Sequence, residues 1–500
     1  MKWIPLLPLL VCFCVLILIG LTWYHKKLQR FFHLFGAFIL LITTFYVFDI
    51  VLKNKMLVAQ LGGYPAPFGI TFVIDLFSGL MLMTTGIIAF CVSIYAINDI
   101  DSHHQGLGFY PAFWTLLMGI CGAFSTGDLF NLYVWFEVML ISSFVLLVLG
   151  NTKEQLDGAM KYVSLNLVAT ILMLLAIALL YGITGTLNMA DLSVKLNTYP
   201  LTGTVTVAVL LLAFAFSIKS ALFPLFFWLP ASYHTTNTAS SAIFAGMLTK
   251  VGVYALVRVC TLILPNSHVL LGLLLFSSAM TMLTGVFGAV SQFHFRRLLS
   301  FHIISQIGYI VMGLAIYTPL ALSGALFFMI HNIFAKTNLF LVSGVCTRLE
   351  KTNDIRKLGG FYQQFPSLAF LFFISAFSLA GIPPLSGFWG KLILLKSALI
   401  TQHYFMVAIL LLVSLLTLYS MTKIWNQVFW KEKPDSSDSL KINLSLKKKV
   451  IYLLPITLLV IATLLMSFFP QYVFSIILQT SDQLFHPDRY IYAVLGGVNV

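Results

Sequence analysis

The sequence predicts an all-α polytopic membrane protein, and three observations support this. Apolar residues make up 60% of the 500 residues, while charged residues make up only 9%. The mean hydropathy is +0.97. Apolar runs of about 20 residues, the length of one membrane span, follow one another along the chain. A soluble protein carries roughly 25% charged residues, so soluble enzymes, disordered chains and disulfide scaffolds are excluded.

The apolar runs predict about 14 transmembrane helices. They lie near residues 3–23, 31–52, 69–97, 108–126, 129–150, 159–184, 203–228, 240–262, 268–290, 298–318, 321–346, 365–398, 403–428 and 450–469. The window at 365–398 is long, but Gly381-Ile382-Pro383-Pro384 divides it. Proline removes a backbone donor, so we count this window as one broken helix.

Lysine and arginine lie mainly in the loops after helices 1, 9, 11 and 13. These residues are Lys26, Lys27, Arg30, Arg296, Arg297, Arg348, Lys351, Arg356, Lys357, Lys431, Lys433, Lys441, Lys447, Lys448 and Lys449. Loops rich in lysine and arginine stay in the cytoplasm, which places both termini on the non-cytoplasmic side. The net charge of +13 therefore reflects topology, and no interleaving of aromatic and basic residues indicates nucleic-acid binding.

Two segments resemble each other and indicate an internal repeat. Residues 215–217 and 376–378 both read AFS, and Phe-Trp follows at the same separation in each segment. Both have proline in mid-span and a lysine beside the break. They fall in helices 7 and 12, an odd offset, which predicts inverted five-helix repeats with both helices broken. We expect helices 1–3 over 1–107, repeats over 108–262 and 268–430, and a basic loop, helix 14 and a tail over 431–500. The tail is expected on the membrane surface or against a partner.

Six ionisable residues are predicted to lie at membrane depth, where a charge costs several kcal/mol and indicates function by default. Glu137 has apolar neighbours on both sides, Lys219 lies five residues before Pro224, and Lys250 lies midway through helix 8. A carboxylate near a buried lysine makes a proton carrier whose affinity changes when one partner moves. The alternatives are a structural carboxyl for Glu137 and lysines that extend to the membrane surface.

The second repeat contributes His331 and Lys336 in helix 11 and Lys391 after the break in helix 12. Histidine titrates near neutrality and suits a relay, although a satisfied buried histidine is the alternative. Asp75 and Asp128, near the starts of helices 3 and 5, are candidate cation ligands because hard cations prefer oxygen. A structural role at the interface is equally open for both.

The chain contains no sequence signature of a chemical active site or a resident cofactor. HExxH, CxxC and the phosphate-binding GxxxxGK[ST] pattern are all absent. No hydroxyl or thiol nucleophile stands beside a base in a recognisable motif. We therefore expect no cofactor and interpret the lysine–histidine series as a proton path.

Three strings resemble the antiporter-like subunits of respiratory complex I over helices 3 to 13. They are residues 125–132 (STGDLFNL) with Glu137, residues 248–254 (LTKVGVY) and residues 380–384 (AGIPP). Three further stretches resemble the D-type subunit of the multisubunit Mrp (Mnh) cation/proton antiporter. These are residues 300–309 (SFHIISQIGY), 62–82 and 490–495 (YIYAVL).

The resemblance implies 14 helices with inverted repeats over helices 4–8 and 9–13. It also implies a pair at Glu137 and Lys219 and a path through Lys250 and His331 or Lys336 to Lys391. It implies membership of a hetero-oligomer in a bacterial cell membrane, in contact with lipids and other subunits. Such assemblies mainly export sodium in exchange for protons, and a preference for potassium stays open.

Two departures from the family pattern affect the loops. The stretch 229–238 lacks a proline that is usual near Thr236 or Asn237, and His294 stands where an acidic residue is common. Two other functions stay open. One is a proton-pumping subunit of a redox-driven complex, an NADH:quinone oxidoreductase or a membrane hydrogenase, and the other is a scaffold that carries no ions.

Overall fold

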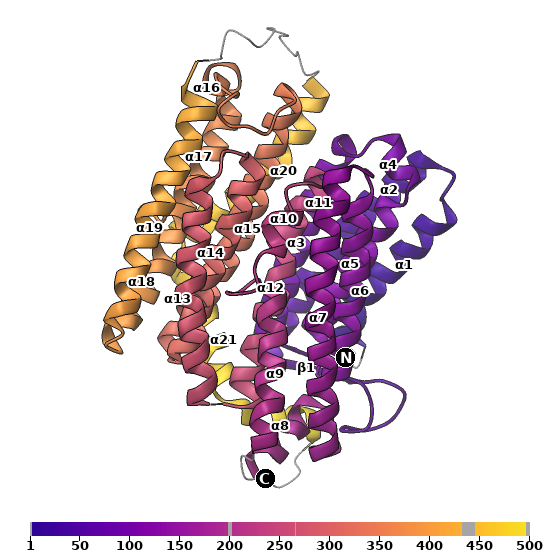
Figure 1. Ribbon diagram of the computed structural model, residues 1–500. Helices are drawn as coiled ribbons and strands as arrows, with labels where there is room; N and C mark the ends of the chain where they lie inside the picture. The colour runs from indigo at the N-terminus through magenta and orange to yellow at the C-terminus, as the bar shows by residue number, and fades with distance from the viewer. Residues whose placement is uncertain (1–2, 199–202, 266, 433–445, 497–500) are drawn as a thin grey trace.

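The computed structural model describes residues 3–198, 203–265, 267–432 and 446–496 as a bundle of long helices (Figure 1). The helices are α1 (Leu7–Leu21), α2 (Lys26–Asn54), α3 (Leu76–Asp99), α4 (Ser102–Gly106), α5 (Phe109–Ser125), α6 (Leu129–Val148), α7 (Lys153–Thr184), α8 (Met189–Thr198), α9 (Gly203–Lys219), α10 (Trp228–Ser232), α11 (Thr238–Ile243), α12 (Thr249–Arg258), α13 (His268–Ser291), α14 (Phe295–Ile316), α15 (Pro319–Glu350), α16 (Phe361–Gln364), α17 (Pro366–Ala380), α18 (Ser386–Ile400), α19 (Tyr404–Ile424), α20 (Leu446–Phe468), α21 (Pro470–Phe485) and α22 (Pro487–Leu495).

The predicted polytopic helical fold is confirmed. Among the described residues, 11 helical stretches are long and apolar enough to cross a membrane, and α5, α9 and α17 are shorter apolar helices. Together they account for all the predicted windows. Both predicted breaks are present: α9 ends at Lys219 and the chain resumes as α10, while α17 ends at Ala380 and resumes as α18. The short lengths of α9 and α17 follow from these breaks.

One short hairpin departs from the all-α prediction. Strands β1 (Met56–Gln60) and β2 (Thr71–Asp75) pair antiparallel, with Met56 opposite Asp75 and Gln60 opposite Thr71. The sequence predicts that the third helix begins near residue 69, because the residues of β2 are apolar and extend the apolar run of α3 toward the N-terminus. The structure shows that these strand residues are buried. Hydropathy alone cannot distinguish a short buried strand from the start of a helix.

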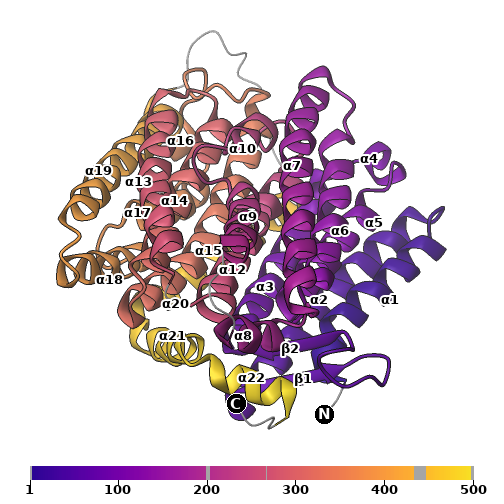
Figure 2. The same ribbon diagram turned by 60° about the horizontal axis from the view of Figure 1, so that its bottom comes forward.

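The hairpin lies at the end of the bundle that also holds both chain termini (Figure 2). The 3-10 turn Ile4–Leu6 contacts β1, and α22 contacts both strands. The loops that carry Lys351, Arg356 and Lys431 lie at the opposite end, near α16 in Figure 1. These positions agree with the prediction that the basic loops share one side of the membrane. Lys433 and Lys441 lie outside the described residues.

The interior and the outer surface carry different residues. Helix α15 is the most enclosed of the long helices, since every residue from 321 to 346 is buried. The outer helices expose large apolar side chains, including Phe38, Phe45, Ile171, Phe276 and Leu415. An apolar outer surface around an apolar core that contains many polar side chains suits a bundle surrounded by lipid, because lipid does not drive apolar side chains inward.

The C-terminal helices α21 and α22 lie across the end that holds the termini (Figure 2). Their contacts are within the chain: the Ser481 hydroxyl donates to Pro319 O at 3.0 Å, at the start of α15. Gln483 accepts from Leu76 N at 3.0 Å and donates to Lys55 O at 3.0 Å. The tail therefore links α15 to the junction between α2, the hairpin and α3.

Candidate functional site

Glu137 and Lys219 meet through a threonine. Lys219 is the last residue of α9, and its Nζ donates to Thr170 Oγ1 of α7 at 3.3 Å. The same hydroxyl donates to Glu137 Oε1 of α6 at 2.7 Å. Lys219 Nζ also lies 5.0 Å from the centre of the Phe136 ring. Thr170 thus stands between an acid and a base, in a position to relay a proton.

A small cavity of about 30 Å³ adjoins Lys219. Its lining includes Tyr162, Asn166, Trp228 and Leu248. A volume of roughly 15 Å³ by this measure holds one water molecule, so this cavity has room for about two. Leu248, the last residue of the turn that precedes Lys250, is part of this lining, whereas Lys250 itself is not.

Lys250 lies just after a widened helical turn. Residues Phe244–Leu248 form a π-helical turn between α11 and α12, and Lys250 Nζ donates to Ala245 O within it at 2.7 Å. Turns of this kind are frequent at functional sites. A Cβ at Gly246 would clash with Thr337 Oγ1, so the glycine lets this turn pack closely against α15.

Lys336 is buried in the middle of α15, and its Nζ has no hydrogen-bond partner among the described residues. It lies within electrostatic range of Lys250 on one side and Lys391 on the other. His302 of α14 is in turn within range of Lys336 and Lys391, and its Nε2 is 2.5 Å from Ser420 Oγ. Lys336 is therefore near lysines from both predicted repeats, residues 108–262 (the first half) and 268–430 (the second half).

The second break holds the other two expected residues. His331 Nδ1 is 2.8 Å from Ser386 Oγ, the first residue of α18. Lys391 Nζ donates to Leu379 O at 3.1 Å and to Ala380 O at 2.9 Å, the last carbonyls of α17. Its ammonium group also lies 5.1 Å from the centre of the Tyr309 ring. A cation placed at a helix C-terminus is stabilised by the free carbonyls there.

Further unpaired polar atoms lie in the interior of α14 and α15. His302 Nδ1, both amide atoms of Gln306, His331 Nε2 and Asn332 Oδ1 are buried without a hydrogen-bond partner among the described residues. Buried polar groups normally find a protein or water partner. Two of these residues, His302 and His331, lie within electrostatic range of Lys336 and Lys391, where ordered water is the expected partner.

Asp75 makes a buried ion pair. Its two oxygens accept from Arg258 Nη1 at 2.7 Å and Nη2 at 2.6 Å. One oxygen also accepts from Ser78 N at 2.9 Å and so caps α3. Arg258 packs against the Tyr254 and Tyr490 rings. Both Asp75 oxygens are engaged by arginine, an arrangement typical of a structural pair.

Asp128 caps α6 by accepting from Asn131 N at 2.8 Å. No group of three or more metal-ligating side chains exists in the portion of the chain that the structure describes. The role of Asp75 and Asp128 as cation ligands therefore stays a prediction, since Asp75 is observed in an ion pair with Arg258 and Asp128 as a helix cap.

Sequence reasoning missed Arg258, Thr170, His302 and Ser386. Arg258 could have been found, because it is an arginine within an apolar run, the same signal that identified Lys250. His302 lay within a string that carried the family resemblance but was given no role. Nothing in the sequence distinguished the hydroxyls of Thr170 and Ser386 as site residues, since threonine and serine are ordinary residues in apolar helices.

The two departures from the family pattern lie together at the basic end. The His234 and His294 rings contact each other edge to face with centres 5.0 Å apart. Arg296 Nη1 donates to Thr236 O at 2.7 Å in the same loop. The altered loop of the first half thus packs on the start of α14 in the second half.

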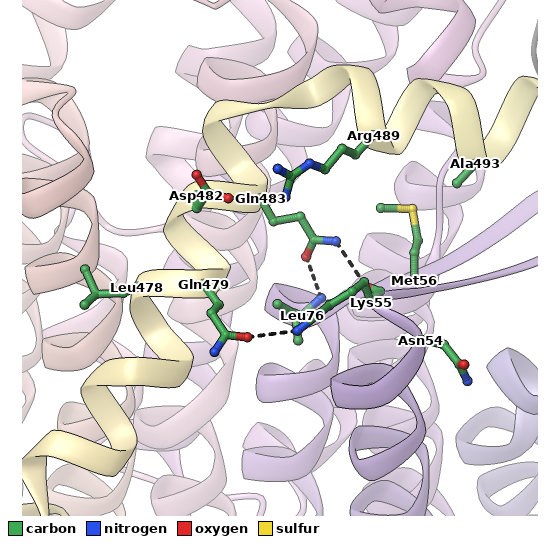
Figure 3. A pocket seen from close by; sticks show the side chains of 10 residues that line it. All are labelled: Asn54, Lys55, Met56, Leu76, Leu478, Gln479, Asp482, Gln483, Arg489 and Ala493. Atoms are coloured by element: carbon green, nitrogen blue, oxygen red, sulfur yellow. Dashed lines mark hydrogen bonds and ion pairs between the residues drawn. The ribbon is translucent and has the colours of Figure 1, made fainter.

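A separate hollow of about 520 Å³ lies between α21, α22 and the end of α2 (Figure 3). Its lining includes Lys55, Gln479, Asp482, Gln483 and Arg489. None of the six relay candidates lines it. The Gln479 and Gln483 side chains point to the α2–α3 junction and hold α21 there (Figure 3).

Comparisons with known proteins show which family this chain resembles. A family described as "NADH:quinone oxidoreductase/Mrp antiporter, TM" matches residues 126–417. The D-type subunit of the Na(+)/H(+) antiporter of Alkalihalophilus pseudofirmus is 44% identical over 98% of this chain and 99% of its own. Its counterpart in Bacillus subtilis is 37% identical over 98% and 99%. A chain in the structure of the Mrp complex from Dietzia superposes with a TM-score of 0.90 at 29% identity, covering 99% of this chain and 100% of its own.

Proposed function

Because the chain belongs to the NADH:quinone oxidoreductase/Mrp antiporter family, and within it to the D-type antiporter subunits, we propose that it translocates protons in a hetero-oligomeric antiporter that exports sodium. The observation that carries this proposal is the row of ionisable residues that runs from the half-buried Glu137 through buried lysines and a histidine to Lys391. Relatives that match over nearly their full length are antiporter subunits, which favours antiport over the redox-driven alternative.

The proposed path has a fixed order of positions. A proton that enters near Lys250 moves through Lys336 and His331 to Lys391 along ordered water and hydroxyls. Glu137, acting through Thr170, sets whether Lys219 keeps its proton. Sodium movement elsewhere in the assembly couples to the row by charge repulsion. One elementary charge is worth about 2.3 kcal/mol per 100 mV, so the membrane potential can drive the exchange.

The proposed setting is a bacterial cell membrane, with the chain among other antiporter subunits and lipids. The basic loops near α16 face the cytoplasm, and the hairpin, α21, α22 and both termini face the other side. Residues 108–262 and 268–430 form the two inverted repeats, each with one broken helix. The support is the placement of the described basic loops at one end of the bundle (Figure 1).

The test is dye-monitored antiport in everted vesicles from cells that lack native antiporters. We expect Glu137→Ala and Lys219→Ala to abolish sodium-dependent proton movement while the complex still assembles. The exposed ion pair of Lys161 and Asp157 offers a matched control, since Lys161→Ala removes a lysine from the same α7 region without touching the interior. Full antiport in either interior variant contradicts the proposed relay.

A further inference from the structure

The second half of the broken helix, α18, begins without a cap of its own. The residue before it, Leu385, supplies no side-chain hydrogen bond to the helix. The first four N–H groups of any helix need partners from elsewhere. Ser386 N donates to Ser467 Oγ of α20 at 2.8 Å, and Gly387 N donates to Ser378 Oγ of α17 at 3.4 Å. Two other helices therefore cap α18.

Ser386 also faces His331. Its hydroxyl lies 2.8 Å from His331 Nδ1 and 3.0 Å from Ser378 Oγ, and all three side chains are fully buried. A hydroxyl can donate and accept at once, so it can stand between an imidazole and a second hydroxyl. Its position depends on the backbone of Ser386, which the hydrogen bond from Ser386 N to Ser467 fixes.

Ser467 has a second tie to α18. Trp389 Nε1 donates to Ser467 O at 3.2 Å, one turn after Ser386. Ser467 lies near the end of α20, outside both proposed repeats, and is buried. After α20 the chain continues into α21, where Ser481 bonds to Pro319 at the start of α15. The same C-terminal segment therefore contacts both helices, α15 and α18, whose side chains meet at His331 and Ser386.

We infer that Ser467 is a positioning residue for proton transfer at His331, acting through Ser386. This inference rests on the proposed function. A cap with a purely structural role would affect only the amount of folded complex. A positioning role also changes how the transfer step at His331 depends on pH, because Ser386 orients the imidazole that exchanges the proton and that faces Lys336 and Lys391.

The experiment compares Ser467→Ala, Ser467→Thr and the control Thr457→Ala in the full complex in everted vesicles. The Thr457 hydroxyl donates to Leu453 O within α20, so its loss tests the helix alone. Loss of one buried hydrogen bond predicts a reduction in antiport of about 3- to 10-fold per assembled complex for Ser467→Ala, with a changed pH profile. Ser467→Thr keeps the hydroxyl, so we expect wild-type antiport and a wild-type pH profile. Thr457→Ala should leave the antiport and the pH profile unchanged.

A double variant tests the route through Ser386. Ser386→Ala removes the hydroxyl that faces His331 but keeps the N–H that bonds to Ser467, so it remains informative if Ser467→Ala fails to assemble. We expect Ser386→Ala to change the pH profile as Ser467→Ala does, and the double variant to be no worse than the single ones. The inference is overturned if the antiport of the double variant falls by the product of the two single losses. It is also overturned if the pH profile is unchanged in assembled Ser467→Ala or in Ser386→Ala. Lys219→Ala in the same vesicles separates the two proposals: if it keeps antiport, the proposed function fails whatever Ser467 does.

Discussion

The two breaks place their lysines in different electrostatic surroundings. At the first break, Lys219 shares Thr170 with the carboxylate of Glu137. At the second, Lys391 is held by two backbone carbonyls. Residues 268–430 contain only two acidic residues, Glu350 and Asp354, both at the basic end of α15. The first half therefore places a carboxyl group beside its lysine, while the second half surrounds its lysine with the carbonyls at the end of α17 and the Tyr309 ring.

The breaks also differ in what holds them. At the first break, Phe223 N donates to Thr281 Oγ1 at 2.9 Å, and Ser277 Oγ donates to Phe223 O at 2.9 Å, both from α13 in the second half. The second break is held by Ser467 of α20. Two segments of similar sequence are therefore held by different helices, α13 and α20, so the two lysines can respond separately when a proton arrives.

The largest effect is expected for variants that keep the positive charge of a lysine but cannot exchange its proton. Lys219→Arg and Lys391→Arg keep a cation, but arginine stays protonated in proteins. A positioned proton-transfer group contributes about 10²- to 10⁴-fold, so we expect each variant to lose antiport by about 100-fold or more. Sodium-dependent proton movement in everted vesicles measures this loss. If Lys391→Arg keeps wild-type antiport, Lys391 is only a cap for α17.

The second prediction concerns the buried ion pair of Asp75 and Arg258. We expect this pair to stay intact, whereas the Glu137–Lys219 pair is expected to change its protonation during transport. Arg258→Met leaves Asp75 buried and unpaired, and we expect a loss of about 3–5 kcal/mol in stability. The Asp75→Asn, Arg258→Met double variant should recover much of this loss. Thermal unfolding of the purified complex measures the loss in the single variant and the recovery in the double variant. As a control, the apparent KM for sodium in Asp75→Asn should stay unchanged, and a marked increase supports a cation-ligand role for Asp75.

A smaller effect is expected where α13 supports the first break. Thr281→Val leaves Phe223 N without its acceptor, which costs about 1–3 kcal/mol for a buried group. Thr284→Val is the matched control, because the Thr284 hydroxyl donates within α13 to Met280 O. We expect the melting temperature to fall for Thr281→Val and to change little for Thr284→Val. Equal melting temperatures for both variants would mean that α13 does not hold the break.

The smallest effect lies outside the membrane spans, where the two halves touch at His234 and His294. Burial, together with the neighbouring Arg296 and Arg297 guanidiniums, lowers the pKa of each imidazole from 6.5 to about 4, while Asp354 partly offsets this at His294. Between pH 6.5 and 4 the unfolded chain binds these protons and the folded chain does not. Stability is therefore complete above pH 6.5 and falls as the pH drops through this window.

His234→Gln with His294→Gln should flatten this acid dependence. The melting temperature of the complex across pH 4 to 7 measures it, with wild type as reference. An equally steep decline in the double variant would place the acid sensitivity at other groups.

Most of the fold was predictable because membrane burial imposes a strong and simple pattern. All the helical windows, both breaks and the placement of basic loops at one end followed from hydropathy, proline and charge. The hairpin at Met56–Asp75 did not, because its second strand is apolar and short. The packing of α21 and α22 also could not be predicted, since it depends on single amide contacts such as those of Gln483.

The candidate site was predictable where a charge stands in an apolar run. Glu137, Lys219, Lys250, His331, Lys336 and Lys391 are all placed in the interior or beside it. The connecting hydroxyls of Thr170, Ser386 and Ser467 were not predictable, because their importance lies in a neighbour from a distant helix. The sequence also could not reveal that Arg258 occupies both oxygens of Asp75.

Lys336→Met gives the most direct test of the central claim, that protons pass along the buried row. Lys336 Nζ has no hydrogen-bond partner among the described residues, and replacing an unpaired buried amine by an apolar side chain should not destabilise the fold. We predict an assembled complex with an unchanged or higher melting temperature and no sodium-dependent proton movement in everted vesicles. Wild-type proton movement in that assembled complex would contradict the account.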